Sequence, residues 1–253
     1  MDCNAIVCYN FNMSNTLIIG KDLPSALDFA QALASTGRKI FAIARNQTEE
    51  ASFESENIFT STWNKSSAVS AHSTLIKAET RLETLDEVVF YFDTEYFCSS
   101  YELDKTEDLS NAVDTMINAF LYSSTELLHR IDQKKEKIFV SFLLKEYPSK
   151  AEAALSKTPG ISPASAVVSA AQQAFSSIAE SFASNAAGRP YLWVTLAKCN
   201  RQNELYANET ELAKWLASAF DTVKQPKNPQ NVKQALTWNK AGSKIQTGFT
   251  LFK

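Results

Sequence analysis

The stretch that most constrains the fold of this chain runs over residues 15–45. Its first part, residues 17–19, is a short apolar run that ends at Gly20. Apolar residues then recur at helical spacing on one face: Ala26, Leu27, Ala30, Leu33 and Ala34. Gly37 stands where a helix C-cap belongs, and residues 40–44 form a second apolar run. The pattern predicts two parallel strands joined by a helix, a unit that is nearly always right-handed.

The rest of the chain repeats this alternation of strands and helices. Further strands are predicted at residues 58–63, 88–92, 138–144, 191–196 and 247–252. Helical patterns are predicted at residues 66–83, 109–134, 163–187 and 208–220, and residues 222–240 are expected to form a polar loop. Strands that alternate with helices in this way favour a parallel sheet with helices on both faces. We therefore expect residues 1–253 to form a single Rossmann-like domain, a doubly wound α-β-α sandwich with a mostly parallel seven-stranded sheet.

Composition excludes several functions for a chain of 253 residues. A net charge of −3 provides no basic surface for nucleic acid. No apolar run approaches the roughly 20 residues that span a bilayer, and the N-terminus lacks the basic and apolar parts of a secretory signal. The sequence therefore predicts a cytoplasmic protein that binds neither nucleic acid nor membrane. Four cysteines without paired spacing and two distant histidines predict reduced thiols and no metal site.

Several positions give the chain a resemblance to the short-chain dehydrogenase/reductase family. That family has a G-x3-G-x-G turn and a glycine that ends the following helix, and Gly20 and Gly37 match its two outer positions. Asn118 matches an asparagine of the family's next long helix, and residues 247–252 resemble its C-terminal strand. The resemblance implies a Rossmann-like fold, a nicotinamide cofactor and a Ser-Tyr-Lys catalytic set.

The cofactor loop of this chain departs from the family pattern. Pro24 and Ala26 replace the two inner glycines, and Pro24 has no N–H to offer a phosphate. Asp22 suits the N-cap of the first helix, where it would compete with a phosphate for the same N–H groups. Asp93 adds a second carboxylate where the family has a glycine near the cofactor. These departures disfavour a bound dinucleotide.

The catalytic positions implied by the resemblance are also changed. Val168 and Gln172 fall at the family's Tyr-x3-Lys pair, so neither an acid nor a cation is present there. The serine position falls near Leu143, with Ser141 as the nearest hydroxyl. Tyr147 is a candidate replacement acid, although it has no lysine four residues later. The short connection at residues 198–207 predicts a poorly covered site, which is unfavourable for hydride transfer. Asn118 is retained, and we expect it to distort its helix.

Three features keep a ligand in consideration. Arg45 follows the second strand, where the resemblance implies that an arginine favours the 2′-phosphate of NADP; a solvated strand-end arginine is the simpler interpretation. Trp63 would stack on an adenine or, more simply, fill its pocket. The aromatic run at residues 90–92 is expected to plug the cofactor groove or to line an apolar pocket. Gly20, Arg45 and Trp63 are thus the candidate cofactor-binding residues.

We favour a non-catalytic protein with a degenerate dinucleotide site that acts as a binding or assembly module. In this interpretation the chain has no enzyme activity and no cofactor. The alternative is an NADP-dependent oxidoreductase with a rearranged site, and a binder of another nucleotide or small metabolite is the third hypothesis. The resemblance also implies a homodimer or homotetramer through the helices at residues 109–134 and 163–187, the second of which is rich in alanine and serine.

Overall fold

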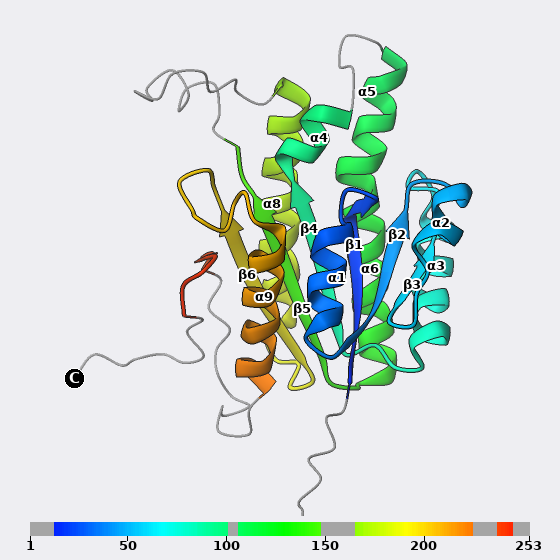
Figure 1. Cartoon of the computed structure of the whole chain (residues 1–253), viewed down its shortest axis with the longest axis vertical. Helices are drawn as coiled ribbons and strands as arrows, with labels where there is room; N and C mark the ends of the chain where they lie inside the picture. The colour runs from blue at the N-terminus through cyan, green and yellow to red at the C-terminus, as the bar shows by residue number, and fades with distance from the viewer. Residues whose placement is uncertain (1–12, 101–105, 148–164, 225–236, 245–253) are drawn as a thin grey trace, which may run out of the picture.

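The computed structural model describes residues 13–100, 106–147, 165–224 and 237–244. The described part is built around a seven-stranded sheet with the strand order β3-β2-β1-β4-β5-β6-β7, in which every pairing is parallel. The predicted Rossmann-like α/β fold is therefore confirmed (Figure 1).

Six of the seven strands lie where the sequence predicts them. The strands are β1 (Ser14–Leu23), β2 (Arg38–Ala44), β3 (Ile58–Ser61), β4 (Glu87–Asp93), β5 (Ile138–Lys145), β6 (Leu192–Cys199) and β7 (Asn239–Lys240). The prediction of a loop up to residue 240 is wrong at its end, because Asn239 and Lys240 pair with β6 and form the edge of the sheet. The strand predicted at residues 247–252 lies outside the described residues.

The helices follow the predicted order with two additions. They are α1 (Leu27–Ser35), α2 (Gln47–Phe53), α3 (Ala68–Leu82), α4 (Thr94–Ser100), α5 (Thr106–Val113), α6 (Ala119–Lys134), α8 (Ala166–Ala186) and α9 (Glu209–Lys224). The sequence did not predict α2 or α4, which are single short helices with little apolar periodicity. The helix predicted at residues 109–134 is interrupted by one π-helical turn, η1 (Asp114–Asn118).

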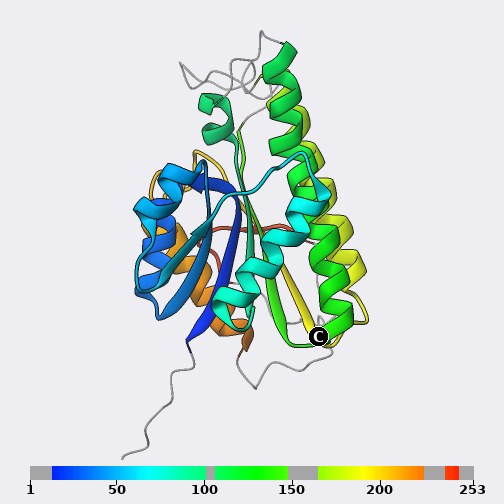
Figure 2. The same ribbon diagram turned by 90° about the vertical axis from the view of Figure 1, so that its right-hand side faces the viewer.

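Helices cover both faces of the sheet (Figure 2). Helices α1 and α9 pack on one face, and α3, α6 and α8 pack on the other. Side chains alternate across each strand, so that Leu17 and Ile19 join one core whereas Ile18 joins the other. The central strand β1 is buried along nearly its whole length, as expected of a strand between two helical layers.

Strand β1 continues beyond the glycine at which the sequence predicts a turn. Gly20 has φ = +118°, and a Cβ atom there would lie 2.6 Å from Cζ of Phe120 and would clash with the backbone carbonyl of Tyr91. The glycine therefore serves a close approach within the sheet, and the strand ends only at Leu23. As a result, α1 begins at Leu27 rather than directly after Gly20.

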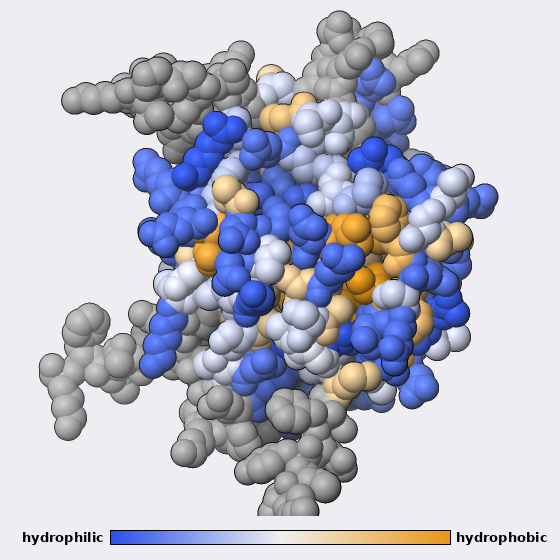
Figure 3. Space-filling view, in the orientation of Figure 1, coloured by the Kyte–Doolittle hydropathy of each residue, from blue (hydrophilic) through white to orange (hydrophobic). Residues whose placement is uncertain are grey.

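The visible surface is mostly hydrophilic. In Figure 3 a small apolar patch lies over β2 between α1 and α2, and polar side chains cover most of the remaining described surface. Among the described helices, none combines the length and the apolar character that a membrane crossing requires. The oligomer expected through residues 109–134 and 163–187 stays a prediction.

Candidate functional site

The candidate site lies where the strand order reverses. Strand β1 leads outward to β2 on one side and neighbours β4 on the other, so the chain has a topological switch point between β1 and β4. In open α/β sheets this is the place where ligands bind, outside the carboxyl ends of the strands. A cavity of about 630 Å³ lies there. Its lining residues are Asp22, Ser25, Ala44, Arg45, Trp63, Asn64, Lys65, Ser66, Tyr96, Ser99, Ser100, Asn111, Asp114 and Thr115. We call it the switch-point cavity.

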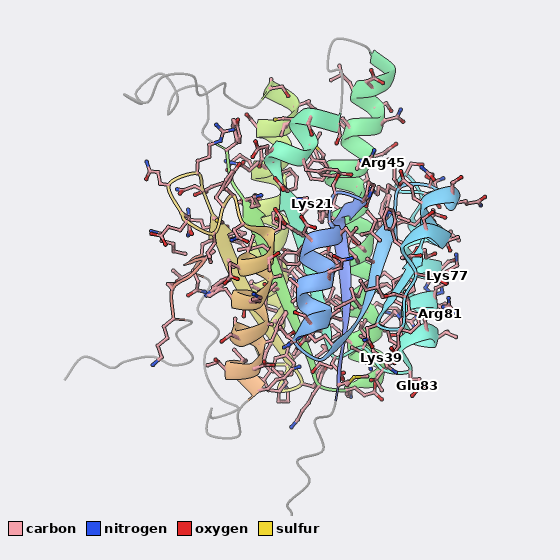
Figure 4. The ribbon with its side chains drawn as sticks, viewed as in Figure 1. Lys21, Lys39, Arg45, Lys77, Arg81 and Glu83 are labelled. Atoms are coloured by element: carbon pink, nitrogen blue, oxygen red, sulfur yellow. The ribbon has the colours of Figure 1, made fainter. Side chains whose placement is uncertain are left out.

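Two of the predicted cofactor-binding residues line this cavity. Arg45 follows the last residue of β2 and is exposed, and its guanidinium has no hydrogen bond or ion pair within the described part of the chain. Figure 4 shows Arg45 at the same end of the sheet as Lys21, with Lys39 at the opposite end. Trp63 is half-buried, and it lines an open space that it does not fill. The structure thus places both side chains where a ligand would contact them.

Asp22 is not the N-cap of the first helix. The N-cap position of α1 is Ala26, which has no capping side chain, because β1 extends to Leu23 and carries Asp22 within the strand. The carboxylate of Asp22 instead pairs with Lys65 from the segment after β3. Its Oδ2 atom accepts a hydrogen bond from Nζ of Lys65. Its Oδ1 atom is buried and has no hydrogen-bond partner among the described residues. The prediction that Asp22 caps the first helix and competes there with a phosphate is therefore wrong.

The aromatic run of β4 does not fill the switch-point cavity. Successive residues of a strand face opposite sides of the sheet. Phe90 and Phe92 therefore pack under α6 and α8, where the Phe92 ring centroid lies 5.8 Å from that of Phe120 and 5.2 Å from that of Phe175. Tyr91 faces α1 and α9. None of the three is among the lining residues of the cavity, and neither is Gly20, whose part in cofactor binding stays a prediction.

A second group of polar residues occupies the carboxyl ends of β4 and β5. We call it the carboxyl-end cluster: Lys21, Tyr91, Asp93, Lys145 and Glu209. Lys21 lies 2.7 Å from Asp93 and 3.0 Å from Glu209. Lys145 lies 3.3 Å from Asp93 and 2.7 Å from Glu209. The hydroxyl of Tyr91 donates to Glu209 at 2.9 Å, so two cations and two carboxylates form a closed, neutral set.

Burial and charge shift the pKa values of Asp93, Lys145 and Tyr91 in this cluster. Burial would raise the pKa of Asp93, but Lys21 and Lys145 outweigh it and lower that pKa. Burial would likewise lower the pKa of Lys145, and the carboxylates of Asp93 and Glu209 outweigh it and raise that pKa. Burial, followed by the charges of Asp93 and Glu209, raises the pKa of Tyr91 far above its usual value. Lys145 therefore stays an ammonium ion, and Tyr91 is a poor acid.

The connection after β6 covers this cluster despite its shortness. Tyr206 is buried, and its ring centroid lies 4.7 Å from Nζ of Lys145, a distance at which a cation and an aromatic ring attract each other. The side chains of Lys21 and Lys145 are only 8% and 6% exposed. The prediction of a poorly covered site is therefore wrong for this part of the groove. The space is closed by the protein's own side chains.

The described residues at the positions that match the family's catalytic set are buried or bonded to neighbouring elements. Val168 is buried in the core, and Gln172 joins α8 to its neighbours by accepting from the hydroxyl of Thr94 at 2.8 Å and from the backbone N of Tyr147 at 3.0 Å. Ser141 is fully buried in the middle of β5, four residues before the end of that strand. None of these side chains lines the switch-point cavity.

Tyr147, the candidate replacement acid, contacts an arginine in the described part of the chain. Its partner is Arg201, whose guanidinium carbon lies 4.4 Å from the ring centroid and whose Nη2 contacts the hydroxyl. Burial nevertheless raises the pKa of Tyr147, against the smaller effect of the arginine charge. Lys145 is held in the carboxyl-end cluster, and Lys150 lies outside the described residues. Among the described residues, no lysine is paired with Tyr147.

Asn118 lies at the end of the π-helical turn η1. Its side chain donates to Oδ1 of Asp114 at 2.7 Å, so it bonds within its own helix. Asp114 and Thr115 of the same turn line the cavity, and π turns of this kind often occur at functional sites. The expected helix distortion at Asn118 is present. Its match to a catalytic asparagine stays a prediction.

Sequence reasoning missed the carboxyl-end cluster as a unit. Asp93 and Lys145 each end a buried strand, and parallel strands bring such ends to one edge of the sheet. That signal was available for these two residues. Glu209 carried no signal, because it joins the cluster from the first turn of α9, 188 residues after Lys21.

Within the described residues, no group of three histidine, cysteine or acidic side chains is arranged to hold a metal ion. The residues present also fit a whole dinucleotide poorly. Such a ligand spans two mononucleotide-binding halves of the sheet. The cavity lies above β1, β2 and β3 and extends to the helices that follow β4, whereas the carboxyl ends of β4 and β5 themselves are occupied by the carboxyl-end cluster.

Comparison with known proteins defines the fold class. No profile of a known protein family and no curated protein matches the sequence. Solved structures do match. A short chain dehydrogenase from Mycobacterium smegmatis aligns with a TM-score of 0.61 at 9% identity over 92% of this chain and 94% of that one. ElxO with NADP bound gives 0.58 at 13% identity over 90% and 97%. The 3-ketoacyl-(acyl-carrier-protein) reductase from Brucella melitensis, complexed with NADH, gives 0.57 at 12% identity over 90% and 96%. At such identities the likeness establishes the fold, which is that of the short-chain dehydrogenases and reductases.

Proposed function

We propose that this protein is a non-catalytic binding module with the fold of a short-chain dehydrogenase/reductase. The observation that carries the proposal is the carboxyl-end cluster. Lys21, Asp93, Lys145 and Glu209 neutralise one another in the half of the groove where the reactive end of a dinucleotide would lie. The switch-point cavity remains beside it as a ligand site.

Hydride transfer to a carbonyl needs two things that this groove does not offer. It needs room for the nicotinamide ring next to the substrate, and the buried cluster takes that room. It also needs an acid that protonates the developing alkoxide, with a pKa near the working pH. The pKa values of Tyr91 and Tyr147 are both raised, and a raised pKa makes a phenol a weaker acid.

A second candidate, an NADP-dependent oxidoreductase with a rearranged site, is favoured by Arg45. This cation lines the cavity next to the end of β2, where an arginine can accommodate a 2′-phosphate. ElxO, which has the same fold, was solved with NADP bound. Under this candidate, Tyr147 is the remaining tyrosine near the predicted catalytic positions.

Hydride transfer itself distinguishes the two candidates. Purified protein is incubated with NADPH or NADH and a panel of aldehydes, ketones and imines, and coenzyme oxidation is followed by absorbance. We expect no oxidation above the protein-free rate. Turnover that is lost in Tyr147→Phe but kept in the control Tyr122→Phe, a tyrosine of α6 outside the cavity, would overturn the non-catalytic proposal.

A further inference from the structure

A second cavity lies at the outer edge of the sheet, beside β3. Its volume is about 330 Å³, and it is lined by residues of α2, β2, β3 and α3. We call it the edge groove. None of its lining residues lines the switch-point cavity. Figure 2 looks onto this edge of the molecule, where β3 ends the sheet. The edge groove is therefore a separate place, away from the carboxyl-end cluster and from the switch point.

The apolar part of the edge groove comes from two side chains. Phe41 of β2 is fully buried and belongs to the core below, whereas Ile76 of α3 is 40% exposed. A ligand that covers Ile76 removes apolar surface from water, and the free energy gained grows with the apolar area covered. This part of the lining therefore favours a ligand with an apolar chain.

Lys77 adds a positive charge that has no acidic partner. Its Nζ atom donates to Oγ of Ser61, a neutral hydroxyl, at 3.2 Å, and it pairs with no carboxylate within the described part of the chain. The other lining cation, Arg81, lies next to it on α3 (Figure 4). The guanidinium of Arg81 already pairs with Glu54 at 2.6 Å. Lys77 is therefore the cation that an anionic ligand would meet.

The backbone of β3 adds a hydrogen-bond donor. Strand β3 is an edge strand, so part of its backbone faces away from β2. Ile40 of β2 donates to the carbonyl of Asn57 at 2.8 Å, and every second residue after Asn57 then bonds to β2 in a parallel ladder. Phe59 and Ser61 continue that series. Thr60 lies between them, lines the edge groove and turns its N–H and C=O outward.

The neighbours of Thr60 limit the kind of ligand. The carbonyl of Ile58 already accepts from the backbone N of Ser55 at 2.9 Å. The backbone N of Thr62 already donates to Oε2 of Glu50 at 3.2 Å, which also engages the acidic lining residue. An added peptide strand pairs with an edge over several residues, and the outward positions beside Thr60 are taken. The edge groove therefore suits a small molecule better than an added strand.

We propose that the edge groove binds a small monocarboxylate with an apolar chain. Its carboxylate accepts from Nζ of Lys77 and from the N–H of Thr60, and its chain lies against Ile76 and Phe41. One unpaired cation matches one negative charge, and two donors match the two carboxylate oxygens. The volume of about 330 Å³ is near the lower limit for small-molecule sites, so the chain is short. The inference goes beyond the proposed function, because it concerns a different cavity.

The test is isothermal titration of the full chain with octanoate, butanoate and octylamine, each below its micelle concentration. We expect octanoate to bind at millimolar concentration. Butanoate should bind at least about 10-fold more weakly, because four fewer CH₂ groups leave water. Octylamine has a chain of the same length with a positive charge, and we expect no measurable binding because Lys77 repels it.

Two variants locate the ligand. Lys77→Met keeps the apolar stem and removes the charge, and it should weaken octanoate binding about 5-fold. Ile76→Asp replaces apolar surface with a negative charge and should weaken binding more than about 10-fold. The matched controls are Lys214→Met, exposed on α9, and Val69→Asp, which is 75% exposed on α3 outside the edge groove. Both controls should leave the affinity unchanged, and the melting temperature of each variant shows whether it is folded.

A third variant separates the two cavities. Arg45 lines the switch-point cavity and is distant from the edge groove in the sequence and in the lining, so Arg45→Met should leave octanoate binding unchanged. A loss of affinity in Arg45→Met without a loss in Lys77→Met would place the carboxylate in the switch-point cavity and overturn the inference.

Three further results would also overturn it. They are no octanoate binding at millimolar concentration, equal affinities for octanoate and octylamine, and full affinity in a folded Lys77→Met variant. The comparison between octanoate and octylamine needs no variant, so it stands even if a substitution prevents folding. Coenzyme oxidation would contradict the non-catalytic proposal and leave this inference intact, so the two fail separately.

Discussion

The two ends of the sheet each hold a neutral set of two cations and two carboxylates. At the carboxyl end these residues are Lys21, Lys145, Asp93 and Glu209. At the amino end they are Arg38, Lys224, Glu87 and Asp221. Helix α9 joins the two sets, since Glu209 lies in its first turn and Asp221 and Lys224 lie near its end. We call the second set the amino-end cluster.

The two clusters differ in geometry. In the amino-end cluster, the guanidinium of Arg38 binds both carboxylate oxygens of Glu87, at 2.8 and 3.1 Å, and Glu87 also accepts from the hydroxyl of Thr16 at 2.7 Å. In the carboxyl-end cluster each cation is a lysine shared between two carboxylates. An arginine fork fixes one geometry, whereas an ammonium ion is a rotatable point charge.

The two clusters also differ in their position relative to the end of the sheet where ligands bind. Ligands of α/β sheets bind at the carboxyl ends of the strands, so charges at the amino end serve architecture alone. The amino-end cluster therefore fixes α9 to β2 and β4. The carboxyl-end cluster performs the same fixation at a place where a relative with this fold could hold a ligand. Stability measurements at both ends can separate these two cases.

The largest effect is expected from Glu87→Gln. Glu87 is fully buried, and its loss of charge leaves the buried guanidinium of Arg38 with a single, mostly exposed carboxylate partner. The free energy of unfolding should fall by about 3–5 kcal/mol in urea titrations. The control Asp221→Asn removes that other partner, whose side chain is 60% exposed, and should cost less than about 1 kcal/mol. Equal losses in the two variants would contradict this description of the amino-end cluster.

A smaller loss is expected from Asp93→Asn at the other end. Asp93 is 2% exposed, and it also accepts from the backbone N of Glu95 at 3.1 Å. Glu209 still pairs with both lysines after the change, so the loss should be about 2–3 kcal/mol. Asp132→Asn, at a surface pair with Arg189, is the matched control and should cost less than about 1 kcal/mol. A loss of unfolding free energy as large as that of Glu87→Gln would show that the two clusters stabilise the fold equally, and it would contradict this prediction.

The smallest effect is expected in the decline of folding stability at acidic pH. Burial would raise the pKa of Glu87 and of Asp93, but the neighbouring cations outweigh it, so both pKa values lie below the usual 4.5 and 3.8. A carboxylate with a lowered pKa in the folded state contributes stability above its usual pKa and loses it as the pH falls toward the folded value. Wild-type stability should therefore decline below about pH 4.5. Urea unfolding at several pH values should show a shallower decline for Glu87→Gln and Asp93→Asn. An unchanged slope in both would contradict the prediction.

Much of the fold could be predicted from periodicity. The alternation of apolar runs and helical faces identified β1, β2, β4, β5 and β6 within a few residues, because burial on two sides leaves a continuous apolar run. The short helices α2 and α4 carry no such stripe, and the two-residue strand β7 is too short to leave a pattern. Gly20 was correctly singled out, but its purpose was misassigned, since only the neighbouring carbonyl of Tyr91 and ring of Phe120 show why no side chain fits there.

The candidate site was less predictable than the fold. Arg45 and Trp63 follow the ends of β2 and β3, and the family resemblance suggested that residues at these positions lie beside a ligand. The direction of the Asp22 side chain depended on where β1 ends. The directions of the side chains at residues 90–92 depended on which face of the sheet each residue occupies. Because β1 extends to Leu23, Asp22 lies within the strand and pairs with Lys65 instead of capping α1.

The sequence by itself determined which segments become strands and helices, and it placed Val168 and Gln172 where the resemblance implies a tyrosine and a lysine. Those properties are local, and they follow from residue type and spacing. The tertiary structure alone decided that Lys21, Asp93, Lys145 and Glu209 neutralise one another, because they come from four elements up to 188 residues apart. It also decided that Asp22 and Trp63 line one cavity. Electrostatic pairing depends on distances of a few ångströms, which only the packed chain sets.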